Sequence, residues 1–425
     1  MKKLSGLLMM SLPFACSLGA CTNGESDPGQ QVNPNAEESA DIAPEGSGST
    51  VLAVTEAQTG FELVSNGFAT PDQFAAALAV FVEQEDEEEG LGPVYNARGC
   101  GDCHDNPTTG GSSQVAEVRA GRLIGATFVD HPGGSLINER AIDPRIQETV
   151  LSLQDVRTLR TSLGLFGLGF VEAIDSNTLL AISNAQPAGQ RGTLIQVPVL
   201  EAPGQIRAGR FGWKDQQASL LSFSADAYLN EMGITSPLQP TENSSNGNSV
   251  ADFDEAPDPE DEDGADIALF ALFMRSLNAP PRDPAPADPA SVQRGSNLFD
   301  AIGCAVCHVR NINTAPPGSV INGGAFVVPA ALGDKTIHPF SDFLLHDVAT
   351  GDGIVQNGGQ GTRNQLRTPP LWGLRVKTRV MHDGVTFTRT EAILRHGNQA
   401  AGARNAFQAL SAGSRQDVIN FLFTL

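Results

Sequence analysis

The chain has 425 residues and a normal apolar fraction of 40%, so it is long enough for two or three domains with real cores. Its formal net charge of -22 argues against binding to nucleic acid or anionic lipid, and it fits either a basic protein partner or simple solubility. Gly and Pro are frequent and aromatic residues are few, which predicts helices joined by long irregular loops.

The N-terminus has the pattern of a bacterial export signal. Lys2 and Lys3 precede a short apolar run, 4–14, which is too short to span a bilayer comfortably. The run ends in Leu18-Gly19-Ala20-Cys21, which is similar to a lipoprotein cleavage box. We expect a signal peptide at residues 1–20 and a lipid on Cys21 that anchors the chain to a membrane. Ordinary cleavage and an uncleaved anchor are the alternatives.

This N-terminus predicts an exported lipoprotein of the cell envelope. It would face the periplasm or the cell surface, and in a Gram-negative cell it would sit on the outer membrane, because Thr22 rather than Asp follows the cysteine. Residues 21–50 are rich in Gly, Ser, Pro, Asn and Glu, and this composition predicts a flexible tether.

The first predicted helix begins at Pro71. Thr70 is its expected N-cap, and Gln73 completes a capping box. Its apolar residues share one face at helical spacing: Phe74, Leu78 and Phe81.

The most informative pattern is a motif that occurs twice, as Cys100-Gly-Asp-Cys103-His104 and as Cys304-Ala-Val-Cys307-His308. The gap of two residues places two thiols at the separation of the two vinyl groups on a porphyrin, and the histidine then offers its imidazole to the iron. Zinc usually needs further ligand pairs, and a redox disulfide does not need the histidine. We therefore predict two covalently bound heme c groups, with His104 and His308 as proximal ligands.

No cysteine remains for a structural disulfide. The chain has six cysteines, of which four lie in the two motifs. Cys16 leaves with the signal peptide and Cys21 takes the lipid, so no free thiol remains in the mature protein.

The segment between the motifs predicts a loop, a helix and a linker. Residues 241–263 are polar and acidic, and we expect a disordered acidic loop there. A helix follows, with Ile267, Phe270, Met274 and Leu277 on one face, and it closes the first heme domain. Residues 279–290 are rich in proline and predict a stiff linker.

The second motif is also flanked by two predicted helices. Ser291 is the expected cap of a helix that runs toward Cys304, and Ser414 is the expected cap of the last helix. The last helix carries an apolar stripe of Val418, Phe421, Leu422 and Leu425.

The two motifs are preceded by matching residues, Tyr95-Asn-Ala-Arg-Gly and Phe299-Asp-Ala-Ile-Gly, which indicates a duplicated heme domain. Few segments alternate as strands do. The predicted fold is therefore mainly α, with two cytochrome c-like heme domains, 51–278 and 291–425, and long irregular loops.

The opposite face of each iron decides the function. A sixth protein ligand makes an electron-transfer heme, whereas an open position makes a reactive one. Five histidines lie outside the motifs and are the candidates: His131, His338, His346, His382 and His396.

Several segments together resemble a known family. The chain is similar over most of residues 90–425 to the diheme oxidoreductases, also labelled thiol oxidoreductases, of the bacterial diheme cytochrome c peroxidase superfamily. The segments that carry the resemblance are Asn96–His104, Gly167–Ile174, Gly209–Lys214, Asn230–Pro237, His338–Asp347, Arg367–Leu374 and Met381–Gly384.

The resemblance implies a ligand for the second heme. In the peroxidases a Met fourteen residues beyond the His-Asp-Gly histidine binds that iron, and the matching position from His382 is His396. The second heme would then have two histidine ligands, His308 and His396, and a lower potential. An ordinary surface histidine is the alternative for His396. His382 would hydrogen-bond near a propionate, whereas His338 and His346 would be structural.

The resemblance also implies the residues around the first heme. Trp213 matches a tryptophan that lies between the hemes and carries an electron or a hole, and Glu231 matches a glutamate over the iron that moves protons of hydrogen peroxide. Core packing is the alternative for Trp213, and a surface or helix-end acid is the alternative for Glu231.

The first iron is expected to be open. Resting peroxidases often block it with a histidine sixteen residues after the proximal one, and that position is Ala120 here. His131 and Met232 are weaker alternative ligands. The glutamine that assists peroxide cleavage has no clear counterpart. Calcium is a superfamily feature, but Lys377 and Arg379 stand near its expected ligands, so no calcium site is predicted.

The leading hypothesis is a peroxidase-like enzyme that reduces hydrogen peroxide at an open first heme. Electrons would come from a donor cytochrome or another redox protein through the second heme. The alternatives are an electron-transfer cytochrome and a diheme enzyme that oxidises a protein side chain or an organic substrate. A thiol oxidase activity receives no support from these residues.

Overall fold

The structure, a computed structural model, describes residues 54–254 and 256–425. The predicted signal peptide, the lipid-bearing Cys21 and the tether at 21–50 lie outside the described residues. Within the part of the chain that is described, none of the helices has the length and the apolar character needed to cross a bilayer.

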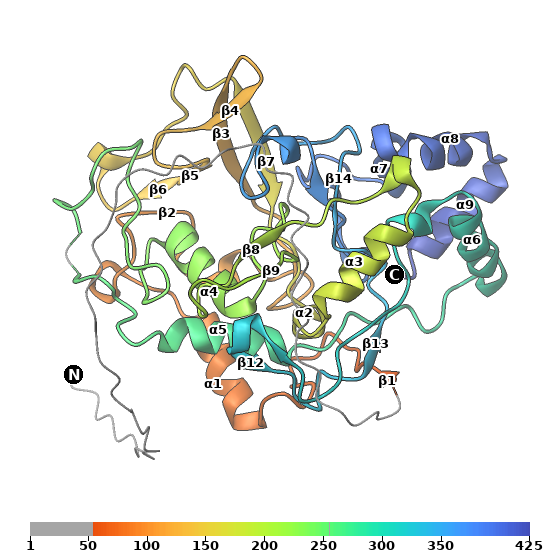
Figure 1. Cartoon of the computed structure of the whole chain (residues 1–425), viewed down its shortest axis with the longest axis horizontal. Helices are drawn as coiled ribbons and strands as arrows, with labels where there is room; N and C mark the ends of the chain where they lie inside the picture. Colours follow the sequence, from red (N-terminus) through yellow and green to blue (C-terminus); the bar gives the residue numbers. More distant parts are fainter. Residues whose placement is uncertain (1–53, 255) are drawn as a thin grey trace, which may run out of the picture. The chain divides into compact units, whose positions relative to one another are not determined.

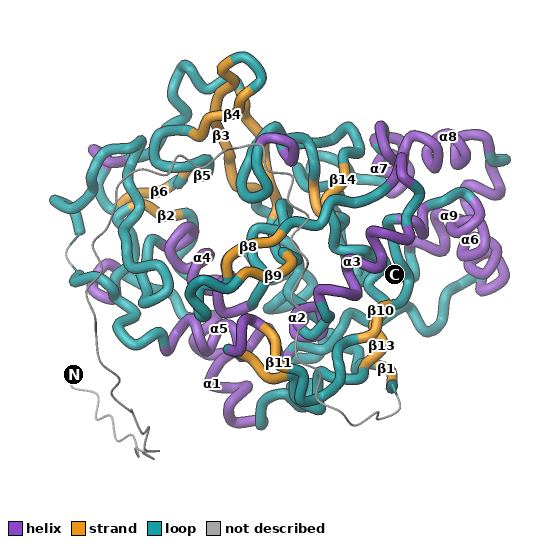
Figure 2. Tube along the Cα trace, viewed as in Figure 1, coloured by secondary structure: helices purple, strands orange, loops and turns teal. Residues whose placement is uncertain are grey.

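Helices and short strands are separated by long loops, as Figure 1 and Figure 2 show. The helices among the described residues are α1 (Pro71–Phe81), α2 (Leu168–Glu172), α3 (Ser176–Ala185), α4 (Leu220–Ala227), α5 (Ala265–Ser276), α6 (Pro289–Ala301), α7 (Arg389–Arg395), α8 (Ala401–Ala409) and α9 (Ala412–Leu422). The strands are β1 (Thr55–Glu56), β2 (Val94–Tyr95), β3 (Ala116–Ile124), β4 (Thr127–Asp130), β5 (Leu136–Ile137), β6 (Arg140–Ala141), β7 (Val156–Thr161), β8 (Gln196–Pro198), β9 (Ile206–Ala208), β10 (Ile312–Asn313), β11 (Val320–Ile321), β12 (Phe326–Val327), β13 (Lys335–Ile337), β14 (Leu345–His346) and β15 (Leu366–Arg367).

The predicted loops and helices are present, but the structure contains more strands than we predicted from the sequence. A four-stranded sheet is built on β3, which pairs with β4, β5 and β7, and β1, β13 and β10 form a second sheet. Most of the other strands are only two or three residues long. Strands this short leave no alternating pattern in the sequence, which explains why they were not predicted. The observed fold is helical with sheets rather than helical with loops alone.

Helices α1 and α5 pack against each other beside the first motif. Thr70 and Gln73 form the predicted capping box at the start of α1. The Phe81 ring lies 4.4 Å from the Phe273 ring of α5, and it also lies 6.4 Å from the His104 ring. The two helices thus form an apolar wall behind the proximal histidine.

Helices α6 and α9 form the corresponding pair beside the second motif, on the right in Figure 1. The Phe299 ring lies 5.4 Å from the Phe421 ring and 6.3 Å from the His308 ring. Both predicted caps were wrong by three residues. Asp288 caps α6 because Pro289 suits the first helical position, and Ser411 caps α9 by accepting a bond from the amide of residue 414.

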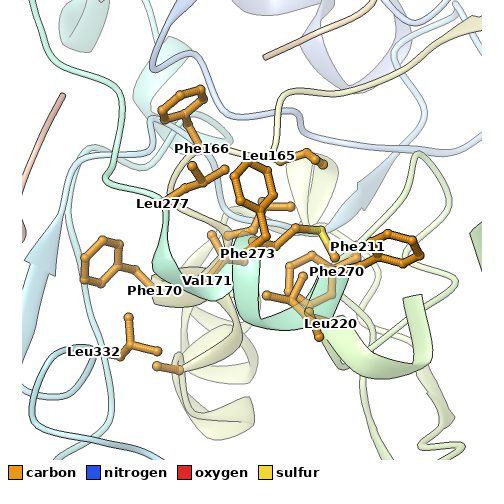
Figure 3. Close-up of a cluster of buried hydrophobic side chains, with 14 of the residues drawn as sticks. Leu165, Phe166, Phe170, Val171, Phe211, Leu220, Phe270, Phe273, Leu277 and Leu332 are labelled. Atoms are coloured by element: carbon orange, nitrogen blue, oxygen red, sulfur yellow. The ribbon is translucent and has the colours of Figure 1, made fainter. Parts of the chain in front are cut away.

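The main hydrophobic core draws on both sides of the predicted linker. Figure 3 shows Leu332 in the same cluster as Phe170, Phe270 and Phe273, although residues 279–290 separate it from them in the sequence. The linker itself is partly packed, since Ala279 at its start is buried in this core. The division into two separate heme domains therefore stays a prediction.

The acidic segment 241–263 contains no helix or strand among its described residues, and its predicted disorder stays a prediction. Hydrogen bonds hold it to the rest of the chain, including those from the Ser245 hydroxyl to the Ile146 carbonyl and from the Thr235 hydroxyl to Glu260. Four carboxylates within it gather within 4.8 Å of one another: Glu242, Asp254, Asp258 and Glu260.

A buried ion-pair network joins β7 to the loop that carries Trp213. Asp352 accepts from Arg160 at 2.6 Å and from Lys214 at 3.0 Å, and all three side chains are at most 2% exposed. Lys214 follows Trp213 in the sequence, and the Trp213 indole donates to the Thr161 carbonyl of β7 at 2.8 Å. The network therefore holds the tryptophan and the strand in one position.

Replacement of Asp352 with alanine is expected to lower the free energy of unfolding by about 3–5 kcal/mol, because two buried cations lose their counter-charge. Urea denaturation of the holoprotein measures this. Arg294→Ala removes a largely exposed ion pair with Asp417 and is the control with a much smaller loss. An equally small loss for Asp352→Ala would contradict the account.

The same network predicts a pH dependence. Burial alone would raise the pKa of Asp352, but the attraction of Arg160 and Lys214 outweighs it and lowers this pKa. Because folding lowers this pKa, the ion pairs of Asp352 contribute their full stabilisation at pH values above the ordinary aspartate pKa. This stabilisation is lost as the pH falls through the lowered pKa of Asp352.

Candidate functional site

One cavity collects the residues predicted to hold the second heme. Cys304, Cys307, His308 and His396 all line it. The motif begins in a 3-10 turn, Cys304–Val306, directly after α6, and His396 is the residue that ends α7. Two segments almost ninety residues apart in the sequence thus bring two imidazoles into one cavity.

The two imidazoles face each other at a distance that suits an iron between them. Their ring centres are 6.5 Å apart. A metal bonded to one nitrogen on each side, with bonds of about 2 Å, places two ring centres roughly 6 Å apart. The observed separation is therefore one at which His308 and His396 could together hold a heme iron.

Backbone carbonyls orient both rings. His308 Nδ1 lies 2.9 Å from the Phe340 carbonyl oxygen, and His396 Nδ1 lies 2.8 Å from the Ala392 carbonyl oxygen. Each Nδ1–H donates to its carbonyl, which leaves Nε2 as the free metal-binding nitrogen. Burial, followed by repulsion from His396, lowers the pKa of His308 to about 4, so the ring is neutral and able to bind a metal.

Basic side chains surround the same cavity. Its lining includes Arg367, Lys377, Arg379, Arg389 and Arg404. Heme carries two carboxylates, and cations of this kind are the partners that buried carboxylates need. The lining therefore fits the acidic edge of a heme as well as its iron.

A separate cavity, the first of the two in chain order, contains the proximal histidine of the first motif. His104 lines it, and its Nδ1 lies 3.1 Å from the Gly111 carbonyl oxygen, so this ring has the same orientation as the other two. Among the described residues, His104 is the only histidine in the lining of this cavity. Instead of a second imidazole, the cavity contains the carboxyl groups of Glu117 and Glu231.

The two carboxyl groups are hydrogen-bonded to each other. Glu117 also accepts from the Arg119 guanidinium at 2.6 Å, and Glu231 accepts from the Asn96 side-chain amide at 2.9 Å. Burial, repulsion by Glu117 and the hydrogen bond to it raise the pKa of Glu231 to about 8. Burial alone would raise the pKa of Glu117, but Arg119 outweighs it and holds this pKa below the ordinary value.

The local fold explains this arrangement. Side chains alternate along β3, so Glu117 and Arg119 project to the same face, and Arg160 of β7 is paired directly opposite Glu117. Glu231 lies in a π-helical turn, Tyr228–Met232, at the end of α4. Its carbonyl accepts bonds from two backbone amides just before the first motif, at 2.8 and 3.1 Å, which ties Glu231 to that motif.

Trp213 lines both cavities. Its indole is held by the bond to the Thr161 carbonyl, and its carbonyl accepts from the Arg367 amide at 2.8 Å. The ring also lies 6.1 Å from the His382 ring, edge to face. The residue therefore stands between the two sites, which is the position expected for it.

Comparison with known proteins agrees with this geometry. The model of a family described as "Di-haem oxidoreductase, putative peroxidase" matches residues 142–425. The chain belongs to this family. The matched range includes Trp213, Glu231, the second motif and His396, and it begins after the first motif. Membership confirms the predicted family, the oxidoreductase class and the use of two hemes.

No curated protein matches the chain. Among solved structures, a hydrazine synthase from Kuenenia stuttgartiensis, pressurised with 20 bar xenon, is 14% identical and aligns over 91% of this chain and 100% of that chain with a TM-score of 0.38. A MauG-like protein associated with microbial copper homeostasis is also 14% identical, over 89% and 95%, with a TM-score of 0.38. The diheme peroxidase BthA from Burkholderia thailandensis E264 is 13% identical, over 89% and 95%, with a TM-score of 0.40.

The alternative ligands for the first iron of this diheme oxidoreductase do not reach its cavity. Both ring nitrogens of His131 contact backbone carbonyls, at 2.9 and 3.1 Å, and His131 lines neither cavity. Met232 is buried in the main hydrophobic core. Ala120 is fully buried in β3 and offers no ligand atom.

The remaining histidines lie in different environments. His338 is half-buried and contacts Asn311 and Glu56. His346 is buried, and its ring contacts Asp342 at 2.8 Å and the Cys307 sulfur at 3.8 Å. His382 lines the second cavity, and its Nδ1 is buried with no partner among the described protein atoms. This free Nδ1 fits the predicted bond to a heme propionate.

The predictions from the sequence did not include Glu117 and Arg119. Their signal was the alternation of charged and apolar residues in Ala116-Glu-Val-Arg-Ala120, which is that of a half-buried strand. Two ionic residues on one face of a buried strand require a polar partner, and Glu231 supplies it.

Proposed function

We propose that the protein carries two hemes attached through thioether bonds and reduces hydrogen peroxide at the first of them. The observation that supports this most directly is the difference between the two cavities. One holds two opposed imidazoles, whereas the other holds one imidazole and a pair of carboxyl groups.

The partly buried cysteines suit thioether attachment. Burial raises the pKa of Cys100 to about 12 and that of Cys103 to about 11, and it also raises that of Cys304 to about 12. Thiols with such values are not thiolates at neutral pH, which disfavours a redox disulfide. Thioether bonds to a porphyrin need no thiolate once formed, so this burial is compatible with heme c.

His104 would hold a heme whose iron would supply the site for peroxide and the exchange of electrons with it. Glu231 provides the proton that a departing peroxide oxygen needs, because its raised pKa keeps it protonated at neutral pH. Trp213 offers a ring between the two sites for the passage of an electron or a hole. His308 and His396 hold the iron that passes electrons from a donor protein.

A lipid on Cys21 and a position in the cell envelope complete the proposal. The export signal and the cleavage box at Leu18–Cys21 support it. Radiolabelled fatty acid should be incorporated into the wild type and not into Cys21→Ser when the gene is expressed in a bacterium. Equal labelling of both would contradict lipidation at this residue.

The function is tested by mixing the holoprotein with hydrogen peroxide and a reduced donor dye. Peroxide-dependent oxidation of the dye is expected, with two molecules of dye oxidised per peroxide for a one-electron donor. A holoprotein with both hemes and no such turnover would contradict the proposal, and it would favour an electron-transfer cytochrome.

His396→Met tests the ligand of the second heme. Exchange of an imidazole for a thioether is expected to raise the reduction potential of that heme while the first heme keeps its potential. Redox titration followed by optical spectra measures both. Phe387→Met, at an exposed residue of the same region, is the control. Unchanged potentials in His396→Met would show that His396 does not bind the iron.

Trp213→Phe tests the path between the hemes. The variant is expected to retain both hemes and to slow electron transfer between them roughly tenfold, which corresponds to about 1.4 kcal/mol in the barrier. Stopped-flow spectroscopy of the partly reduced protein after mixing with peroxide measures this rate. An unchanged rate would restrict Trp213 to packing.

A further inference from the structure

The carboxyl groups of Glu117 and Glu231 must share a proton. They are hydrogen-bonded to each other inside the first cavity, and two carboxylates in contact cannot both be ionised without a large repulsion. A hydrogen bond between two carboxyl groups also needs one hydrogen, which only a protonated group supplies. The pair therefore holds one proton and one negative charge at rest.

The neighbours decide which carboxyl group is charged. Glu117 contacts the Arg119 guanidinium at 2.6 Å, and Arg160 stands opposite it on β7. Glu231 contacts the neutral amide of Asn96. Asp130 and Asp226 also line the cavity, and Arg119 attracts both. Arg119 also attracts Glu231, but its hydrogen bond goes to Glu117. The negative charge thus resides on Glu117 and the proton on Glu231.

The pair also lies close to the first heme site. Both glutamates line the cavity that contains His104. Both also interact electrostatically with Cys103, one of the two cysteines of the first motif. Arg119 and Trp213 line the same cavity.

We propose that Glu117 and Glu231 act as one acid–base unit on the peroxide, in which Glu117 receives a proton and Glu231 gives one. This inference rests on the function proposed above and deepens it, because it names the base. The sequence analysis assigned both proton movements to Glu231 alone, and the glutamine of the peroxidases has no clear counterpart in the sequence.

The proton movements balance. One oxygen of hydrogen peroxide loses its proton to the Glu117 carboxylate, and the other receives the Glu231 proton. When the O–O bond breaks, its electron pair stays with the protonated oxygen, which leaves as water. The remaining oxygen takes two electrons that originate from the donor protein and two protons from solvent, and it forms a second water. The hydrogen bond between the glutamates then returns the proton from Glu117 to Glu231.

This unit predicts a specific pH profile. The acid form is lost when Glu231 ionises, and burial and the Glu117 charge raise its pKa to about 8, so the rate falls above this pH. At low pH the rate falls when Glu117 becomes protonated, and Arg119 delays that fall by lowering the pKa of Glu117 despite its burial.

Glu117→Gln is the decisive variant. It is expected to lower kcat/KM for hydrogen peroxide about 100-fold, because the base is missing. It also removes a negative charge beside Glu231, so the alkaline limb of the pH profile should move to lower pH. Glu139→Gln, at an exposed residue nearby, is the control and should leave both the rate and the limb unchanged. A slower Glu117→Gln enzyme with its alkaline limb at the wild-type pH would overturn the proposal.

Cyanide binding separates this inference from the proposed function. Hydrogen cyanide must give up its proton to a base near the iron when it binds, so the pH dependence of its association rate reports the pair without peroxide chemistry. The profile is expected to shift in Glu117→Gln relative to wild type, and the ionisation of cyanide itself cancels in this comparison. A shift in a protein without peroxidase turnover would retain the acid–base unit and reject the function. No shift in a protein that does turn over peroxide would reject the acid–base unit and retain the function.

Glu231→Gln covers the case in which the first variant does not fold. The glutamine cannot release a proton to the peroxide, so the alkaline limb should disappear and the rate should fall. An alkaline limb that persists near pH 8 in Glu231→Gln would assign that limb to another group and would overturn the proposal.

Discussion

Three hydrogen bonds from imidazoles to backbone carbonyls set the chemistry of both sites. His104 donates to Gly111, His308 to Phe340 and His396 to Ala392. A backbone carbonyl cannot turn away as a side chain can, so each bond fixes the ring and leaves Nε2 directed at the cavity. The orientation of each candidate ligand is consequently set by the backbone.

The two sites share a proximal side and differ on the opposite side. On the proximal side, Phe81 and Phe299 lie at nearly the same distance from His104 and His308, 6.4 and 6.3 Å, and at the same angle of 54°. In the cavity of the first histidine, a sheet brings Glu117 and a π-helical turn brings Glu231. Opposite the second, α7 brings His396. Under the proposed function, the first half would carry the reactive heme and the second half the electron-transfer heme.

The sequence predicted the parts of the site that depend on local spacing. The two motifs, the cap of α1 and the apolar faces of α1, α5 and α9 follow from short-range patterns, and the structure contains them. His396, Trp213 and Glu231 came from resemblance to a family, and the structure places each beside the expected cavity. Their roles at bound heme stay predictions.

Other features depend on contacts between distant residues and could not be predicted. Glu117 lies 114 residues before Glu231, and only the pairing of β3 with β7 turns it toward the cavity. The caps of α6 and α9 were misplaced because two capping residues stood near each start. The shared core likewise arises from Leu332 packing on residues of the first half, which no local pattern reveals.

Unequal coordination of the two irons is the central claim. EPR of the resting ferric holoprotein, with both signals quantified, tests it most directly. The account predicts one high-spin iron and one low-spin iron in equal amounts, because one cavity presents a single imidazole and the other presents two. Two low-spin irons in the resting protein would contradict it.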